Sequence, residues 1–490
     1  MVEKSNFSKT IKGLYSQSFV TVVMGILGLL SFSIMSRLLT KTEFGYYATI
    51  ISVVMIFRSL AEAGIGSSIV QHKDNSVDFV NTAYSLSLIV GGIATFVVIT
   101  FSRFFSDVIA DRSIQIPLIL ISLTLVPYSL NSVYSSLLLK DLHFLKIGIF
   151  QIVAFLVSNV IAIIMAVMDY GLLSIVIGNI LYILFQNIIF RFFSPIKPFF
   201  SISKQCTLDI LNFGGWLTAS RLIGAIYSQI DKILMAKLLS IADLGNFYRT
   251  RGFIEDINGR LGGVFDTTLF PILSRIQDDK NAIQRAYKKS VDLGSIFFSM
   301  LFLLFFFNAR LIILCFLGDK WLDQITLFRI LTLSMLFYFL TRFADCFIRS
   351  LAYVKFGFYI QLLSCCLLML SVFYAVSYGA LGVAVAVVAV NLLSSIIKAK
   401  YICSKIGISF FSLCKYSLRG VAYAIPLVIM GIIFIINYDE SNTQSIIFLC
   451  CFIAVSIVLF ICCPKIIGET YANQIYPHLK FMISKICRSL

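Results

Sequence analysis

The chain has 490 residues, of which 59% are hydrophobic and only 13% are charged, with 40 lysines and arginines against 24 aspartates and glutamates. Its mean hydropathy of +0.94 lies far above that of soluble globular proteins. The composition therefore excludes a soluble globular protein and indicates a polytopic membrane protein.

Apolar runs that are long enough to cross a bilayer as helices recur along the whole sequence. The first run is longer than the apolar part of a secretory signal and lacks a convincing cleavage site, so we expect it to be a membrane helix. The fourteen predicted spans lie near Tyr15–Leu39, Phe44–Val70, Phe79–Phe101, Ile116–Leu139, Ile147–Met168, Leu172–Phe193, Thr207–Met235, Leu244–Phe270, Val291–Leu317, Ile325–Leu351, Gly357–Val376, Leu381–Tyr401, Tyr416–Ile436 and Ser445–Cys463. The fold class predicted from them is all-α.

The basic residues are distributed unequally over the two sides that these spans define. With both termini in the cytoplasm, the cytoplasmic segments hold 23 lysines and arginines and the opposite segments hold seven. Cytoplasmic loops of membrane proteins carry such an excess of positive charge. The net charge of +16 is thus predicted to be a topology signal, and it requires no nucleic-acid partner.

The cysteines and histidines do not indicate a chemical site. The twelve cysteines lie mainly inside apolar runs, without metal-ligand spacing, and are typical of small apolar fillers. The three histidines are scattered over predicted cytoplasmic segments. We therefore expect no metal, no cofactor and no catalytic residue.

An internal repeat at a shift of 200 residues organises the sequence. The segment Met35–Gly45 aligns with Met235–Gly245, with identical Met, Leu, Leu and Gly and similar residues at the polar turn positions. A shift that spans six helices predicts parallel repeats around an axis along the membrane normal. The predicted domains are an N-terminal lobe at 1–200, a C-terminal lobe at 201–405, and two further helices with a cytoplasmic tail at 406–490.

The predicted span that begins near residue 243 is unusually rich in charge. At roughly 100° per residue, Arg249, Asp256 and Arg260 fall within about 40° of one another and form one stripe. Asp256 stands four residues before Arg260, which is the favourable orientation for an ion pair on a helix. Each ionisable group at bilayer depth costs on the order of 2.5–3.5 kcal/mol on insertion scales, so this helix is expected to line a protein-walled or aqueous interior. The alternative is an amphipathic surface helix between two spans.

Other predicted spans also carry ionisable residues at helical spacing. Arg58 and Glu62 are four residues apart and share a face, and basic residues outnumber acidic ones overall. This excess favours an anionic ligand, the alternative being ion pairs that hold helices together. The candidate substrate-binding residues of a cationic cavity are Arg58, Arg221, Arg249, Arg251, Arg260 and Arg342. The candidate ion-coupling or gate residues, for proton or sodium, are Glu62, Asp231, Asp256 and Asp345.

Several short motifs resemble those of a known family. Together they are similar to Wzx-type polysaccharide and O-antigen exporters, in the colanic-acid-exporter-like branch of the multidrug/oligosaccharidyl-lipid/polysaccharide (MOP) exporter superfamily. The motifs are Ser36-Arg37-Leu38-Leu39 leading into Phe44-Gly45, Phe213-Gly214-Gly215-Trp216-Leu217-Thr218, Leu269-Phe270-Pro271 with Ile276-Gln277-Asp278-Asp279, and Gly318-Asp319-Lys320-Trp321. Their order and spacing fit from about residue 8 to about residue 400.

The resemblance implies a flippase that moves undecaprenyl-diphosphate-linked oligosaccharide across the bacterial cytoplasmic (inner) membrane by alternating access. Its product would serve lipopolysaccharide, O-antigen, capsule or exopolysaccharide biosynthesis. The partners expected are the lipid-linked oligosaccharide and membrane lipids, with polysaccharide polymerase and chain-length proteins as further contacts. A planar guanidinium can bind phosphate oxygens bidentately, which suits arginine to a diphosphate.

Two other functions are compatible with a helical membrane protein. A cation-coupled drug or solute antiporter of the same superfamily would need an acidic, aromatic-lined pocket, whereas the interior charges found here are mainly basic. A membrane glycan polymerase or ligase would need a large exoplasmic loop for its catalytic groups, and no such loop is predicted. The sequence thus favours a transporter and not an enzyme.

Overall fold

The computed structural model describes residues 2–62, 64–72, 76–109, 111–141, 143–351, 353–437 and 442–462, and these residues form helices and connecting turns without a β-strand. The α-helices are α1 (Val2–Leu38), α2 (Lys41–Glu62), α3 (Ile65–Gln71), α4 (Val77–Thr100), α5 (Ser102–Ile109), α6 (Gln115–Ser122), α7 (Leu125–Lys140), α8 (Phe144–Val167), α9 (Leu172–Phe193), α10 (Lys204–Leu238), α11 (Ile241–Arg275), α12 (Lys280–Phe307), α13 (Ala309–Phe316), α14 (Ile325–Ser350), α15 (Val354–Ala375), α16 (Gly379–Ile406), α17 (Phe410–Asn437) and α18 (Asn442–Cys462). Three 3-10 helices are η1 (Arg112–Ile114), η2 (Asp319–Gln324) and η3 (Val376–Tyr378).

Each of the fourteen predicted spans coincides with one long helix or with consecutive shorter helices. By length and hydropathy, nine helical stretches among the described residues can cross a membrane, or ten if the bent helix α17 is included. The charged helices α10 and α11 are not among them. The chain is an all-α multi-pass membrane protein, as its composition predicts.

The chain divides into two compact units. The first contains Met1–Arg249 and Gln361–Val383, and the second contains Thr250–Ile360 and Ala384–Leu490. The lobes at 1–200 and 201–405 remain a prediction. Helix α10 packs on α2 inside the first unit. Residues 463–490, which include most of the predicted cytoplasmic tail, lie outside the described residues.

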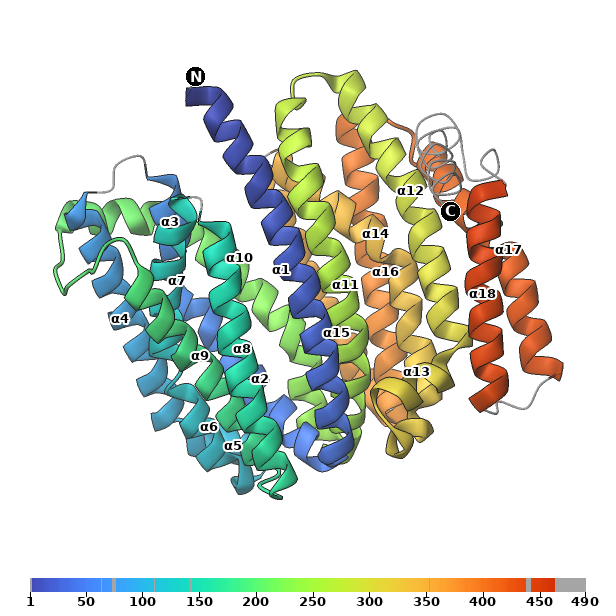
Figure 1. Cartoon of the computed structure of the whole chain (residues 1–490), viewed down its shortest axis with the longest axis horizontal. Coiled ribbons are helices and arrows are strands. Elements are labelled where there is room, and N and C mark those ends of the chain that lie inside the picture. The colour runs from blue at the N-terminus through green and yellow to red at the C-terminus, as the bar shows by residue number, and fades with distance from the viewer. Residues whose placement is uncertain are drawn as a thin grey trace, which may run out of the picture. The chain divides into compact units, whose positions relative to one another are not determined.

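In the first unit, α8 packs between α1 and α9, while α4 and α3 pack on α7 (Figure 1). Helix α2 is the most enclosed, and its buried residues include polar Thr49, Ser52 and Arg58 beside apolar ones. It is separated from α3 near Gly64, whose φ of 63° lies in the left-handed region that glycine adopts without strain. A polar and enclosed α2 is the element on which the charged residues of this unit converge.

The repeat seen in the sequence is a repeated helix junction. Thr40 Oγ1 and the Thr40 amide donate to the Glu43 carboxylate at 2.8 and 2.7 Å before α2, and Ser240 Oγ donates to Asp243 at 2.7 Å before α11. The Asp243 amide donates back to Ser240 Oγ at 3.0 Å. These are capping boxes, which satisfy amides that a helix N-terminus otherwise leaves unpaired. The matching polar residues of the repeat therefore start the same helix twice.

In the second unit, α12 packs along α17, and α17 packs on α18 (Figure 1). Buried apolar residues join the three helices: Leu303, Phe307, Ala424, Leu427, Phe434, Phe448 and Phe452. Helix α17 bends by 47° between Phe410–Gly420 and Ala424–Phe434. Pro426 explains this bend, because its ring cannot donate to the carbonyl four residues earlier and collides with it.

Gly420 sets the distance between α17 and α12. A Cβ atom added at this position would lie 2.4 Å from the Ser295 carbonyl carbon and 2.7 Å from the Ile296 amide nitrogen. Both are backbone atoms that cannot rotate away, so the two helices must separate to accept a side chain.

We therefore expect Gly420→Ala to destabilise the protein by about 1–3 kcal/mol, the usual cost of overpacking. Thermal unfolding of the detergent-purified protein would measure this change. Gly92→Ala is the matched control, because a Cβ atom at Gly92 meets no atom within 4 Å. Equal melting temperatures for the two variants would contradict the expectation.

Candidate functional site

Arg58 of α2 lies at the centre of a polar cluster inside the first unit. Its Nη2 donates to Asn179 Oδ1 of α9 at 2.7 Å and to Thr124 Oγ1 at 3.3 Å. The guanidinium also lies over the ring of Tyr128 of α7, 5.1 Å from its centroid. Only 5% of the residue is exposed. Arg58 is thus a buried cation that is held by neutral oxygens and an aromatic face.

Glu62, one turn after Arg58, joins this cluster to α10. One carboxylate oxygen accepts from the Tyr128 hydroxyl at 2.9 Å, and the other accepts from Arg221 Nη1 at 2.9 Å. Arg221 Nη2 also donates to Ser67 Oγ of α3 at 3.2 Å. The side chains of Arg221 and Glu62 are 39% and 30% exposed, so this end of the cluster is open.

The cluster carries an excess of positive charge. It contains two guanidinium groups and one carboxylate, which pairs with Arg221, whereas Arg58 makes no ion pair within the described part of the chain. Its Nε has no hydrogen-bond partner there either. Burying a cation without a counter-ion is costly, and cation–π contact and neutral acceptors offset only part of that cost. The geometry therefore favours an anion beside this cluster.

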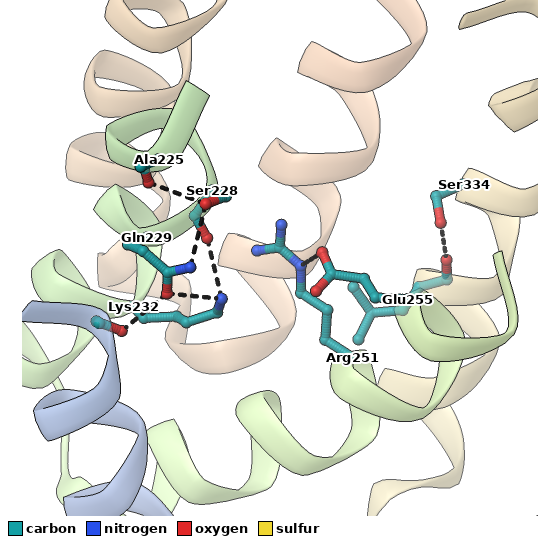
Figure 2. A network of polar contacts seen from close by, with 9 residues as sticks. Ala225, Ser228, Gln229, Lys232, Arg251, Glu255 and Ser334 are labelled. Carbon is teal, nitrogen blue, oxygen red and sulfur yellow. Dashed lines mark hydrogen bonds and ion pairs between the residues drawn. The ribbon is translucent and has the colours of Figure 1, made fainter. Parts of the chain in front are cut away.

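A second polar group lies along α10. Lys232 Nζ donates to the Ser228 carbonyl at 2.9 Å and to Gln229 Oε1 at 3.1 Å, as Figure 2 shows. Ser52 of α2 donates to the same Gln229 oxygen at 3.1 Å. Asp231, a predicted coupling residue, is completely buried on the same helix. These contacts tie the polar face of α10 to α2.

Arg249, at the start of α11, has a different environment from Arg58 and Arg221. Its Nε donates to Ser36 Oγ of α1 at 2.7 Å, and its Nη2 donates to the Phe32 carbonyl. The guanidinium lies over the rings of Phe32 and Phe44, at 3.3 and 4.4 Å from their centroids. Only 9% of the residue is exposed, so its donors face protein and not an open cavity.

Four further charged residues of α11 belong to the second unit and form two ion pairs within the helix. Arg251 Nε lies 2.7 Å from Glu255 Oε1 (Figure 2), and Arg260 Nε lies 2.8 Å from Asp256 Oδ2. The predicted pairing of Asp256 with Arg260 is confirmed. Both pairs have the spacing of four residues that places side chains on one helix face.

Asp345 of α14 has a partner that its sequence spacing does not indicate. Lys398 Nζ of α16 lies 2.8 Å from Asp345 Oδ1, with the two side chains 8% and 34% exposed. One turn away, the hydroxyls of Thr341 and Ser395 are 2.7 Å apart and connect the same two helices.

Arg342 lies above Gly262 of α11 in the second unit. A side chain at Gly262 would approach Arg342 Nε to 2.8 Å and the Tyr338 hydroxyl to 2.5 Å. The glycine thus leaves room for the arginine to lie across α11. In the sequence, Arg342 is a candidate by its charge alone. Its close approach to Gly262 is seen only once the helices are packed.

Sequence analysis missed Tyr128, Asn179 and Thr124, which contact Arg58 or Glu62 directly. They are uncharged and lie 66 or more residues from Arg58, so they carry no charge or spacing signal. The only sequence signal for them is a polar residue within an apolar run.

Comparison with known families identifies the chain. The family model described as "Polysaccharide biosynthesis protein" matches residues 34–326, which is more than half of the chain. The chain belongs to this family. The match includes α2, α10 and α11, which carry most of the candidate site residues.

One relative in this family is the lipopolysaccharide biosynthesis protein WzxC of Escherichia coli K12. It is 24% identical to this chain over 326 residues, and the aligned part covers 66% of each protein. The chain thus spans about two thirds of the length of this relative.

Two solved structures share the fold of this polysaccharide biosynthesis protein. The lipid II flippase MurJ in an inward closed conformation has a TM-score of 0.72 at 14% identity and covers 90% of this chain and 97% of its own. An inward-facing multidrug MATE transporter of the MOP superfamily has a TM-score of 0.61 at 13% identity, covering 81% of this chain and 99% of its own. The all-helical fold is that of the MOP transporters.

For this member of the family, the Asp345–Lys398 pair generates a stability prediction. Lys398→Met removes the buried partner of the pair and leaves Asp345, whose side chain is 34% exposed. Water compensates part of the loss, so we expect a cost of about 1 kcal/mol, the lower end for an unsatisfied buried group. Because Asp345→Asn removes the charge that Lys398→Met leaves behind, we expect the double variant to lose less stability than the two single losses combined.

A double-mutant cycle by thermal unfolding in detergent would measure the coupling. Lys400→Met is the control, because Lys400 is exposed on the same helix. Strictly additive effects of the two changes would contradict an interaction between Asp345 and Lys398.

Proposed function

We propose that this protein is a flippase that translocates undecaprenyl-diphosphate-linked oligosaccharide repeat units across the cytoplasmic membrane. It acts as a transporter and not as an enzyme, in the biosynthesis of a surface polysaccharide. Its family, the naming of a relative for lipopolysaccharide biosynthesis, and its likeness to a structure named as a lipid II flippase support this proposal.

The observation that carries the proposal is the cluster of Arg58, Glu62, Tyr128 and Arg221. A diphosphate cannot enter hydrocarbon without compensation of its negative charge, and charge-assisted hydrogen bonds from arginine provide the strongest compensation that side chains offer. Arg221 is the member of the cluster that is open to a ligand, since its side chain is 39% exposed. Arg58 is buried and adds positive charge behind it.

Glu62 gives this site an internal anion. Its carboxylate holds Arg221 Nη1 at 2.9 Å, in the position that a phosphate oxygen of the ligand would take. An arriving diphosphate would compete with Glu62 for Arg221, while Tyr128 continues to hold the carboxylate from its other side. Such an exchange keeps the guanidinium paired in both the empty and the loaded states.

The second unit contributes further cations to the proposed path. Arg251, Arg260 and Arg342 are proposed to contact the diphosphate or acidic sugars. Arg251 and Arg260 are each paired with a carboxylate on the same helix, so they carry less uncompensated charge than Arg58.

Transport is proposed to follow alternating access between the lobes at 1–200 and 201–405, with residues 406–490 as an addition. Proton or sodium coupling through Glu62, Asp231, Asp256 or Asp345 is part of the proposal. Three of these carboxylates hold a basic partner, so protonation of any of them would release a cation. Contacts with polysaccharide polymerase and chain-length proteins are proposed as well.

Substitution of Arg58 and Arg221 tests the cationic site. We expect alanine at either position to reduce glycan export by roughly 10- to 100-fold, since a hydrogen bond to a charged group contributes about 1.5–3 kcal/mol. Lysine keeps the charge but not the planar fork, so its effect should be intermediate. Surface-glycan display, normalised to the amount of protein in the membrane, is the measurement.

Arg112→Ala is the control, because Arg112 is exposed and pairs only with Asp107 at 3.3 Å. Normal export by both alanine variants at equal expression would rule out the cationic site.

The charge asymmetry of the loops generates a topology prediction. Both termini should lie in the cytoplasm, and the loops at 102–115 and 308–324 should be exoplasmic. Reporter fusions after Lys4 and near Lys480 would test this, and a periplasmic signal from either fusion would refute the arrangement.

A further inference from the structure

The two copies of the sequence repeat meet at their glycines. A Cβ atom added at Gly45 would lie 1.9 Å from the Ile241 carbonyl oxygen, and one added at Gly245 would lie 1.8 Å from the Lys41 carbonyl oxygen. The first turns of α2 and α11 therefore cross with their backbones in direct contact. Each repeat supplies the glycine that lets the other approach, so the contact is reciprocal.

Arg249 fastens this crossing to α1. It lies one turn after Gly245 and reaches between Phe32 of α1 and Phe44 of α2, while it donates to Ser36 Oγ at 2.7 Å. Next to it, the rings of Tyr47 and Tyr248 meet edge to face at a centroid distance of 6.2 Å. All of these residues belong to the first unit.

Arg249 also breaks the symmetry of the repeat. The equivalent residue of the first copy is Thr49, whose hydroxyl donates to the Gly45 carbonyl of its own helix at 3.0 Å. At this position the first copy bonds to its own helix, whereas the second copy reaches α1. This single arginine connects the ends of α1, α2 and α11.

We propose that Arg249 is a positioning residue, and that with Gly45 and Gly245 it forms a latch that closes one end of the helix bundle. The latch parts and re-forms in each transport cycle. This proposal rests on the alternating access proposed above. In the proposed topology the latch is at the exoplasmic end, where α1 passes into α2 and α10 passes into α11.

The chemistry of the latch suits a contact that must be reversible. Closed, the arginine is compensated by two aromatic faces, a hydroxyl and a carbonyl. At the two glycines α2 and α11 meet backbone to backbone, with the Ile241 side chain and the Tyr47–Tyr248 ring pair beside this contact. Open, the guanidinium regains water and the two glycines expose little apolar surface. The free-energy difference between the closed and the open latch is therefore smaller than it would be if a packed apolar core had to separate. A small difference of this kind is what allows both conformations to be populated.

The position of Arg249 further separates it from the ligand-binding cations. Its guanidinium is enclosed by Phe32, Phe44 and Ser36, so a diphosphate could reach it only after the latch had parted. Arg221, by contrast, is accessible while its own ion pair is intact.

Thiol accessibility of a buried reporter tests the latch without any substrate. In a cysteine-free background, Thr49→Cys places a thiol at a position on α2 that is fully buried. The detergent-purified protein is treated with a water-soluble maleimide, and the labelling rate is compared among further variants. These are Gly45→Ala, Gly245→Ala, Arg249→Lys and Arg249→Met.

We expect both alanine variants and Arg249→Met to raise the labelling rate at least tenfold, and Arg249→Lys to restore a rate near that of the parent. The control is Gly252→Ala on the same helix, because a Cβ atom at Gly252 meets no atom within 4 Å. Melting temperatures within a few degrees of the parent would show that the increase is local opening. If a glycine variant does not fold, the two Arg249 variants decide the outcome.

Labelling rates equal to that of the control in all four variants would overturn the latch, whatever the export measurements show. If the variants label faster than the parent but the parent itself exports no glycan, the latch is supported and the proposed transport function is refuted. Export by Arg249→Lys at the parent level, together with loss of export in Arg249→Met, would further support a positioning role.

Discussion

The cost of holding charge inside a membrane constrains the rest of this structure. An unpaired Arg58 would be costly in hydrocarbon, and it is surrounded by Asn179 of α9 and by Thr124 and the ring of Tyr128 at the start of α7. Satisfying this one side chain requires α2, α7 and α9 to converge. Polar residues such as Asn179 and Thr124 occur in or beside these apolar helices because they accept hydrogen bonds from Arg58.

The ion pairs divide into those that close within a helix and those that join helices. Arg260 and Asp256 neutralise each other on α11, whereas Arg221 reaches Glu62 on another helix. The inter-helical cluster retains an excess of positive charge, because Arg58 brings no carboxylate with it. For this reason the proposed binding of an anion is placed at this cluster, although basic residues occur in both units.

The repeat links local sequence to a contact between distant segments. The capping boxes at Thr40 and Ser240 start two helices in the same way, and the glycines two residues after each box lie against each other's helix. A duplicated junction can form such a reciprocal contact, since each copy provides both a glycine and the backbone carbonyl that the glycine of the other copy approaches. Arg249 then makes the contact specific, because only one copy carries it.

The sequence by itself determined the helical class, the membrane location, the positions of the helices, the repeated junction and the Asp256–Arg260 pair. These features depend on composition or on residues within four positions, which helical geometry places at known spacings. Only the tertiary structure decided that Lys398 pairs with Asp345, that Tyr128 links Arg58 to Glu62, and that Arg249 is enclosed by α1 and α2. Such partners depend on how each helix is rotated and packed, and a neutral acceptor inside an apolar run leaves no periodic signal.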